Sequence, residues 1–431
     1  MNKLYTKLEL LYSRITGNVA FYPSLIAFMG LALGFLMSYA EQQGISKYLI
    51  DTIPALVIND ADTARTLLST FIGGIFSLMV FSFSMVMLIL NQASSNYSPR
   101  ILPGLIANKR HQVVLGFYIA VIIYCIIILL SIEPEQSKTQ LPGFAVLIGI
   151  VLSIHVLAAF IYFIHSISQA IQINNIIDRI YKVSRDRIQH LIDTESDPKG
   201  VDVFKNNDSW QSYTTKFSGH LNDIALDSLV DFCNEHSCKV SLLVPKGSFV
   251  LDSTKIVSVN KDLNEEAIEA LRSCFGFSRS EIVKNNYILG FKQLTEIAVK
   301  AMSPGINDPG TAITCLDYLT ELFVLRMQKR DNSFVTDKDG NALVSLRTIN
   351  FEEVLYFIFA SLRQYCKADF IMLHKMLQSL RYLSTSDALK DEYTEAIINQ
   401  VQLIIDDASQ FIKNESDLAI LNKVASEVQA S

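Results

Sequence analysis

Four apolar stretches dominate the first 165 residues of the chain. None of them contains Asp, Glu, Lys or Arg, and each is long enough to cross the ~30 Å hydrocarbon core of a membrane. The four stretches are Asn18–Ala40, Thr66–Leu90, Gln112–Ser131 and Leu141–His165. They predict a domain of four transmembrane helices over residues 18–165. In residues 1–17, leucines recur on one helical face, which predicts an N-terminal helix at the membrane interface.

The helical period continues beyond the fourth stretch. Apolar residues recur near one side of residues 166–193, so we expect the fourth transmembrane helix to extend outward as a helical stalk. A stalk of this kind packs either on other copies of the chain or on its own domain. The sequence leaves both interpretations open.

The rest of the chain predicts a small module followed by a mainly helical part. Residues 208–260 indicate an α/β or β-rich module, with strands at Ser209–Phe217, Lys239–Val244, Ser248–Leu251 and Lys255–Val259 and a helix at Leu221–Asn234. Residues 261–431 predict helices at Leu263–Phe275, Arg279–Met302, Pro309–Gln328, Phe351–Tyr365, Lys367–Leu383, Asp387–Ile412 and Ser416–Val428, with a hairpin around Asp339–Gly340. The expected fold is a polytopic α-helical membrane protein with four transmembrane helices and a cytoplasmic α+β domain.

Positive charge distinguishes the two sides of the membrane, because cytoplasmic flanks carry an excess of Lys and Arg. Ten basic residues flank one set of helix ends, whereas the opposite loops carry only Lys47 and Lys138, with Arg65 at a border. Both termini are therefore expected in the cytoplasm. Residues 165–431 carry 28 basic and 36 acidic side chains, a net charge of −8, so the cytoplasmic domain is acidic. A pI of about 5.7 argues against nucleic acid as a partner.

The second stretch carries a polar repeat of seven residues. Thr70, Ser77, Ser84 and Asn91 recur at this interval, which keeps them on one side of a helix. One interpretation is a pore lining built by several copies of this helix. The other is a packing face, because small residues let membrane helices approach closely, and this is the more common use of such a pattern.

Two histidines and one loop are further candidates near the membrane. His155 lies near the middle of the fourth stretch and His165 near its cytoplasmic end, and ionisable groups inside a membrane are functional candidates. A proton relay would need carboxylates at that depth, and the four stretches contain none. We therefore expect a neutral His155 bonded to a hydroxyl on a neighbouring helix.

After the second stretch, Ser98 and Arg100 form an interface loop. This loop acts as a gate or, as we favour, as an anchor at the lipid headgroups.

The run Ser303–Thr311 separates two predicted helices. Asp308 followed by Pro309 fits a helix cap and first helical position, and this structural interpretation is favoured. A helix start can also hold an anion, in which case Ser303, Asn307, Asp308 and Thr311 are the candidate ligand residues.

Motifs for metal or enzyme chemistry are weak. Cys233, His236 and Cys238 lack a second ligand pair, so we expect no metal site. No phosphate-binding, dinucleotide-binding, zinc-protease or nucleophile-elbow motif occurs, so we expect no cofactor and no enzyme activity.

Three runs of residues also carry a resemblance to a known family. They are Asn96-Tyr97-Ser98-Pro99-Arg100, then His165 with Ser168-Gln169-Ala170-Ile171-Gln172, and Ser303-Pro304-Gly305-Ile306-Asn307-Asp308-Pro309. Through them the chain resembles, over nearly its whole length, the bacterial predicted membrane proteins called domain of unknown function 2254. Gly310 departs from the threonine-like residue usual there. The resemblance implies a bacterial inner-membrane protein with four helices and a cytoplasmic domain, and it implies no activity.

Together these features favour an oligomeric channel in the bacterial inner membrane. The second transmembrane helix would line the path, and the cytoplasmic domain would regulate it. The expected partners are the lipid bilayer, further copies of the chain, and an ion or a small anionic ligand. The alternative is a membrane-anchored sensor or scaffold that binds a ligand or protein through its cytoplasmic domain. A third interpretation is an enzyme that acts on lipid through His165, Arg100 and Asp308, but no sequence motif supports it.

Overall fold

The computed structural model describes residues 20–46, 48, 60–96, 109–132, 141–195, 198–205, 207–279, 286–331 and 333–430. The chain divides into two compact units, the first ending at Asn175 and the second beginning at Ile176. The expected interfacial helix at residues 1–17 and the interface loop with Ser98 and Arg100 lie outside the described residues.

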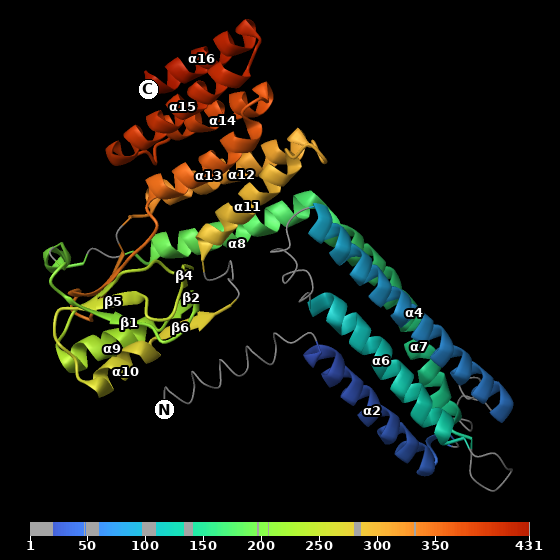
Figure 1. Cartoon of the computed structure of the whole chain (residues 1–431). Coiled ribbons are helices and arrows are strands. Elements are labelled where there is room, and N and C mark those ends of the chain that lie inside the picture. Colours follow the sequence, from blue (N-terminus) through green and yellow to red (C-terminus); the bar gives the residue numbers. More distant parts are fainter. Residues whose placement is uncertain are drawn as a thin grey trace. The chain divides into compact units, whose positions relative to one another are not determined.

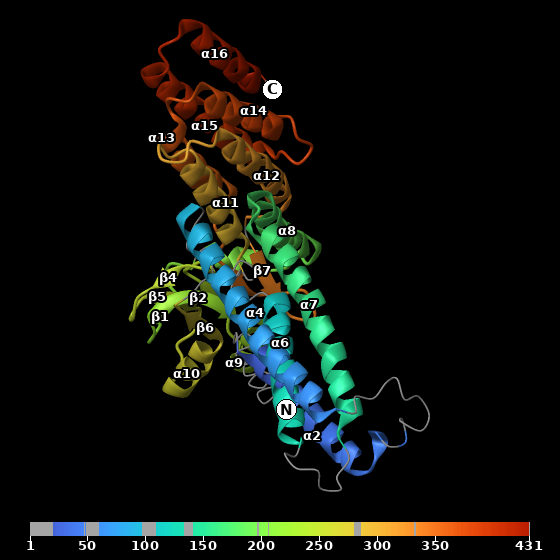
Figure 2. The ribbon, with the colours of Figure 1, turned by 90° about the vertical axis from the view of Figure 1, so that its right-hand side faces the viewer.

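The first unit is a bundle of long helices that run side by side (Figures 1 and 2). They are α2 (Phe21–Gln42), α4 (Ala61–Asn96), α6 (Lys109–Leu130) and α7 (Gly143–Ile171). All four are long and apolar enough to cross a membrane. Helix α4 begins before the predicted Thr66, because Asp60 accepts a hydrogen bond from the Thr63 amide (2.7 Å) at its first turn.

Helix α6 forms the centre of this bundle. Its residues Tyr118, Tyr124 and Ile128 are completely buried, and the Tyr124 hydroxyl donates to the carbonyl of Ala145 on α7 (2.8 Å). At the start of α7, the Glu41 carboxylate accepts from the Ala145 amide (2.8 Å) and the Ser46 hydroxyl from the Phe144 amide (2.9 Å). These contacts satisfy two of the amides that a helix start leaves without a partner.

The predicted continuous stalk is wrong, because the helix breaks. Helix α7 ends at Ile171, Gln172 has extended backbone (φ −61°, ψ 123°), and α8 (Ile173–Asp193) follows. The Asn175 side chain donates to the Gln169 carbonyl (2.8 Å), which stabilises the break. Within the second unit, α8 buries one face, formed by Ile176, Ile177, Ile180, Ser184 and Ile188. Of the two interpretations of residues 166–193, the structure therefore supports a helix, α8, that packs on its own domain.

The described residues of the second unit form two β-sheets. The larger has the strand order β1 (Gln211–Thr214), β5 (Lys255–Val259), β3 (Val240–Leu242), β8 (Ala342–Leu346) and β7 (Ser333–Thr336), and the smaller the order β4 (Phe249–Val250), β2 (Gly219–Ile224) and β6 (Phe275–Ser278). Among the strands of the described residues, β3 and β8 pair in parallel and the other strand pairs are antiparallel. The expected hairpin around Asp339–Gly340 is confirmed as β7–β8, and it joins a sheet whose other strands lie at residues 211–259.

The predicted helix at Leu221–Asn234 is partly wrong. Residues 219–224 form strand β2, in which Leu221 pairs with Phe277, and the helix α9 spans Leu226–His236. A six-residue segment is too short for its apolar spacing to separate a strand from a helix. The predicted helix at Leu263–Phe275 is likewise shorter, α10 (Glu265–Ser273), because Phe275 begins β6.

The remaining helices agree with the sequence-based expectation to within about one turn at their ends, apart from the helix predicted at Arg279–Met302. The helices are α11 (Tyr287–Ala301), α12 (Pro309–Gln328), α13 (Phe351–Cys366), α14 (Phe370–Ser384), α15 (Asp391–Phe411) and α16 (Glu415–Gln429). Helix α11 begins only at Tyr287, because Asn286 has extended backbone (φ −141°, ψ 103°) and its side chain caps the Ile288 amide. These helices form a stack (Figure 1), in which α11 packs on α12 and α13, and α14 packs on α12, α15 and α16. Helix α13 begins with a capping box between Asn350 and Glu353, which accounts for its sharp start.

Candidate functional site: the exposed face of α4

Helix α4 has two opposite faces with the same spacing. Its buried residues Leu68, Ile75, Ser82 and Ile89 recur every seven positions and pack inside the bundle. Each is followed two positions later by a residue of the polar repeat: Thr70, Ser77, Ser84 and Asn91, all exposed. Two residues correspond to about 200° around an α-helix, so the polar repeat lies nearly opposite the packing face.

The hydroxyls of this face are bonded to their own helix. Thr70 donates to the carbonyl of Thr66 (2.7 Å), Ser77 to that of Gly73 (2.9 Å) and Ser84 to that of Val80 (2.9 Å). Each hydroxyl therefore has its donor satisfied and keeps oxygen lone pairs that can accept a further bond. Such a face is compatible with lipid, with another helix or with water.

The same face has room for close approach. A Cβ added at Gly73 or Gly74 would meet no described atom within 4 Å beyond the adjoining backbone of α4 itself. Phe81 and Leu88 lie close to the hydroxyls around the helix and are 49% and 60% exposed. The small-residue face is thus not used for packing inside this chain, which leaves it available to lipid or to another molecule.

The two histidines do not form a site together. His155 is exposed, and its Nδ1 lies 2.8 Å from the carbonyl of Val151 on the same helix, so the expected bond to a hydroxyl on a neighbouring helix is wrong. His165 is also exposed, with its Nε2 3.0 Å from Nε2 of Gln169.

The Ser303–Thr311 loop uses its polar groups internally. The Asp308 carboxylate accepts from the Thr311 amide (3.1 Å) and from the Thr311 hydroxyl (2.6 Å), and these bonds lower the pKa of Asp308. Ser303 donates to the Lys300 carbonyl (2.7 Å). Asn307 has left-handed backbone (φ 49°), which makes the turn into α12. The structure therefore confirms that Asp308 caps the start of α12. A ligand role for Ser303, Asn307, Asp308 and Thr311 remains a prediction.

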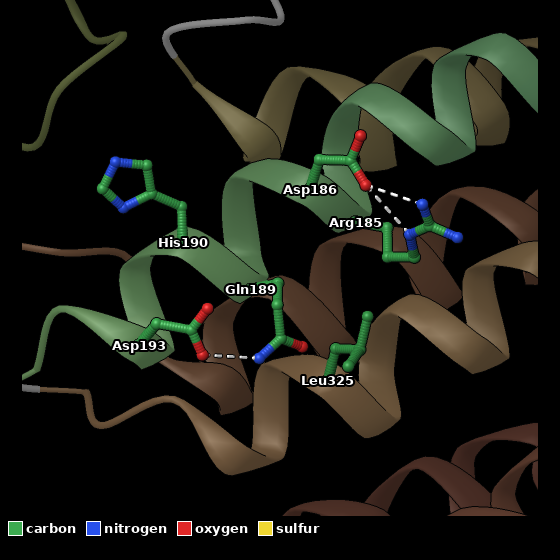
Figure 3. Close-up of a pocket in the computed structure, with 6 residues that line it drawn as sticks. All are labelled: Arg185, Asp186, Gln189, His190, Asp193 and Leu325. Carbon is green, nitrogen blue, oxygen red and sulfur yellow. Dashed lines mark hydrogen bonds and ion pairs between the residues drawn. The ribbon is translucent and has the colours of Figure 1, made fainter.

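Two other kinds of polar cluster are candidates for a functional site, a metal centre and a charged surface depression. No three His, Cys, Asp or Glu side chains gather there in a way that would hold a metal ion. A surface depression beside α8 is lined by Arg185, Asp186, Gln189, His190, Asp193 and Leu325. Figure 3 shows that Arg185 forms an ion pair with Asp186 (2.7 Å) and that the Gln189 amide donates to the Asp193 carboxylate (2.8 Å), while His190 is directed away from both.

Comparison with known proteins agrees with this architecture. The family described as predicted membrane protein (DUF2254) matches residues 16–382. Uncharacterized proteins from Mycobacterium tuberculosis and Mycobacterium bovis are each 24% identical to this chain, over 94% of its length and 79% of theirs. No solved structure matches it. Because the match covers most of the sequence and includes all four membrane-length helices, the chain belongs to the predicted membrane protein family DUF2254.

Proposed function

We propose that this protein is an oligomeric channel of the bacterial inner membrane, in which copies of α4 surround a path lined by Thr70, Ser77, Ser84 and Asn91 and meet beside it at Gly73 and Gly74. The observation that carries the proposal is the position of the face that carries these residues. It lies opposite the side of α4 that packs inside the bundle, and nothing in the described chain covers Gly73 or Gly74. A second copy of α4 is the occupant with the matching shape, because small-residue faces pair with each other in membranes.

The lining chemistry supports a weakly selective path. Hydroxyls that already donate to their own helix can still accept hydrogen bonds from water. The described residues of the four spans contain few charged groups, all near helix ends, so no ring of carboxylates or guanidinium groups would select ions by sign. Four spans are few for a path within one chain, and this favours a path shared by several copies.

The charge distribution supports the orientation. Basic residues concentrate beside one set of helix ends, so we propose that both termini and the second unit lie in the cytoplasm. The second unit would then regulate the path. The alternative, an anchored sensor that reads a ligand at Ser303–Thr311, has less support because the polar groups of Ser303, Asp308 and Thr311 are engaged in the loop.

Cross-linking in membranes tests the shared face. The six native cysteines are all buried, so Ser77→Cys would add an exposed thiol on the lining face, directly beside the proposed contact between copies. The matched control is Phe83→Cys, which is 58% exposed and lies about 120° away around the helix. Oxidation should link copies of the full-length Ser77→Cys protein and leave the Phe83→Cys protein largely monomeric. Equal linking at both positions, or none at Ser77→Cys, would contradict the proposal.

A further inference from the structure

A cavity of about 160 Å³ lies inside the second unit, between α8, the β-sheets and the start of α11. Four basic residues line it: Arg187, Lys246, Lys329 and Arg347. No Asp or Glu occurs among its described lining residues. This concentration of positive charge is unusual here, because residues 165–431 carry eight more acidic than basic side chains.

Two of the four cations are held by protein groups. The Lys329 ammonium donates to the Arg330 carbonyl (2.7 Å) and the Ser333 hydroxyl (3.1 Å), with the Glu195 carboxylate 3.6 Å away. Arg347 donates to the Leu243 carbonyl (3.0 Å). These contacts fix both side chains in the wall of the cavity, and they use more of the hydrogen-bonding capacity of Lys329 than of Arg347.

The other two cations are poorly compensated. The Lys246 ammonium lies 3.8 Å from the Asp223 carboxylate, whose side chain is 67% exposed and therefore well screened by water. The Arg187 guanidinium makes no hydrogen bond or ion pair with any residue in the described part of the chain. Burial lowers the pKa of Lys246, and Arg187 is close enough to lower that pKa further. Two like charges share one partly buried space, and an anion placed there would stabilise both.

The rest of the wall is apolar. Leu226, Leu242, Ile288 and Leu346 face the same cavity. A cavity of this volume accommodates an apolar body of about six carbon atoms, the size of a benzene ring. Binding sites for small molecules combine such walls with a few convergent polar groups.

We propose that this cavity binds a small organic anion, a phosphate ester or carboxylate whose head group lies between Arg187 and Lys246. Its apolar body, of about six carbons, packs against Leu226 and Ile288. The inference does not depend on whether α4 conducts, and it gives the second unit a ligand site separate from the Ser303–Thr311 loop.

Binding of matched probes to the full-length protein in nanodiscs tests this assignment. The probes are phenyl phosphate and benzoate as anions, benzyl alcohol as the neutral analogue, benzylammonium as the cation and inorganic phosphate as the head group alone. At least one of the two aromatic anions should bind by calorimetry, more tightly than the other three probes. Preference for phenyl phosphate would identify a phosphate ester, and preference for benzoate would identify a carboxylate.

Two variants locate the site. Arg187→Gln should weaken binding of the preferred anion about tenfold or more, because a charge-assisted contact is lost. The control is Arg185→Gln on the same helix, whose guanidinium pairs with Asp186 outside the cavity, and it should leave affinity unchanged. Leu226→Asp should also abolish anion binding while α9 stays folded, because an acidic residue is favourable in a helix's first turn.

Three results would overturn the proposal. One is the absence of binding of both aromatic anions at millimolar concentration. Another is binding of benzylammonium or benzyl alcohol as tight as that of the anions. The third is equal loss of affinity in Arg187→Gln and Arg185→Gln. Far-UV circular dichroism and the fluorescence of Trp210, the single tryptophan, report whether each variant keeps its fold.

Discussion

Gly30 of α2 lies directly against Ala120 of α6: a Cβ on Gly30 would be 2.4 Å from the Ala120 carbonyl oxygen. The two backbones can approach this closely only because Gly30 has no side chain. Gly73 on α4 has the opposite surroundings, because an added Cβ would meet no described atom within 4 Å beyond the adjoining backbone of its own helix. One glycine is therefore used for packing inside the chain, and the other is left open.

This contrast predicts two different consequences of the same substitution. Gly30→Leu should disrupt folding of the single chain, since overpacking costs about 1–3 kcal/mol or more and α6 cannot move away within the bundle. Gly73→Leu should leave the monomer folded and weaken the association of copies. Yield and thermal stability in detergent measure the first effect, and cross-linking through Ser77→Cys measures the second. Loss of the monomer fold in Gly73→Leu would contradict the account.

A second close contact tests the docking of α8. A Cβ on Gly290 of α11 would lie 1.8 Å from the Ser184 hydroxyl oxygen and 2.9 Å from its Cβ. Gly290→Ala should therefore destabilise the second unit by about 1–3 kcal/mol. Adding Ser184→Gly should restore most of the loss, whereas Ser184→Ala should restore less because its Cβ still clashes. Urea unfolding followed through Trp210 measures the series, and no rescue by Ser184→Gly would argue against this packing.

Arg326 and Asp331 join α12 to the hairpin and to α13. Arg326 is completely buried and donates to the Asp331 carboxylate and to the Ile349 carbonyl (2.9 Å). Asp331 also accepts from the Phe351 amide (3.0 Å). Asp331→Ala would leave a buried guanidinium without its counter-charge, and we expect a loss of about 3–5 kcal/mol.

The control for this prediction is Asp186→Ala. It removes a pair with Arg185 in which both side chains are largely exposed, so the expected change is below about 1 kcal/mol. Urea titration with Trp210 fluorescence compares the two variants. Similar losses in both would mean that the buried pair is not a structural centre of this unit.

Lys329 predicts a pH dependence of stability. Burial lowers the pKa of Lys329 to about 8 in the folded protein, below its usual 10.5. Between these values the unfolded chain holds the proton more tightly, so this group makes the folded state more stable as pH rises above 8. Relative to Lys329→Met, the wild-type protein should gain about 2 kcal/mol between pH 7.5 and 9.5.

The comparison with Lys329→Met is needed because other groups act in the opposite direction. Burial raises the pKa of the Cys366 thiol to about 12, so thiolate formation in the unfolded chain lowers stability at high pH. Both proteins contain this thiol, and the difference between them isolates Lys329. A difference that stays constant over this pH range would show that Lys329 is not perturbed as described.

The sequence predicts the helices better than the strands. The four apolar stretches and the helix beginning at Pro309 are strong local signals, since length, composition and capping residues define them. The sequence favours a helix where strand β2 forms, because the residue that pairs with Leu221 in this strand, Phe277, lies more than 50 residues away. The break at Gln172 depends on a side-chain contact of Asn175 that no apolar spacing reveals.

The candidate sites differ in the same way. The polar repeat on α4 is a local pattern, and it could be read from spacing alone. The cationic cavity could not, because Arg187, Lys246 and Arg347 come from distant segments that only the folded chain brings together. Sequence spacing also could not show that α4 packs through Leu68 and Ile75 rather than through Thr70 and Ser77.

Ion flux into liposomes that contain the purified full-length protein tests the central proposal most directly. The paired variants are Ser84→Leu, which adds bulk to the proposed path, and Ser84→Ala, which removes only the hydroxyl. The account predicts flux in the wild-type protein, loss of flux in Ser84→Leu and retained flux in Ser84→Ala, with cross-linking through Ser77→Cys preserved in both backgrounds. No flux in assembled wild-type protein over a range of voltage, tension and pH, or full flux in Ser84→Leu, would contradict it.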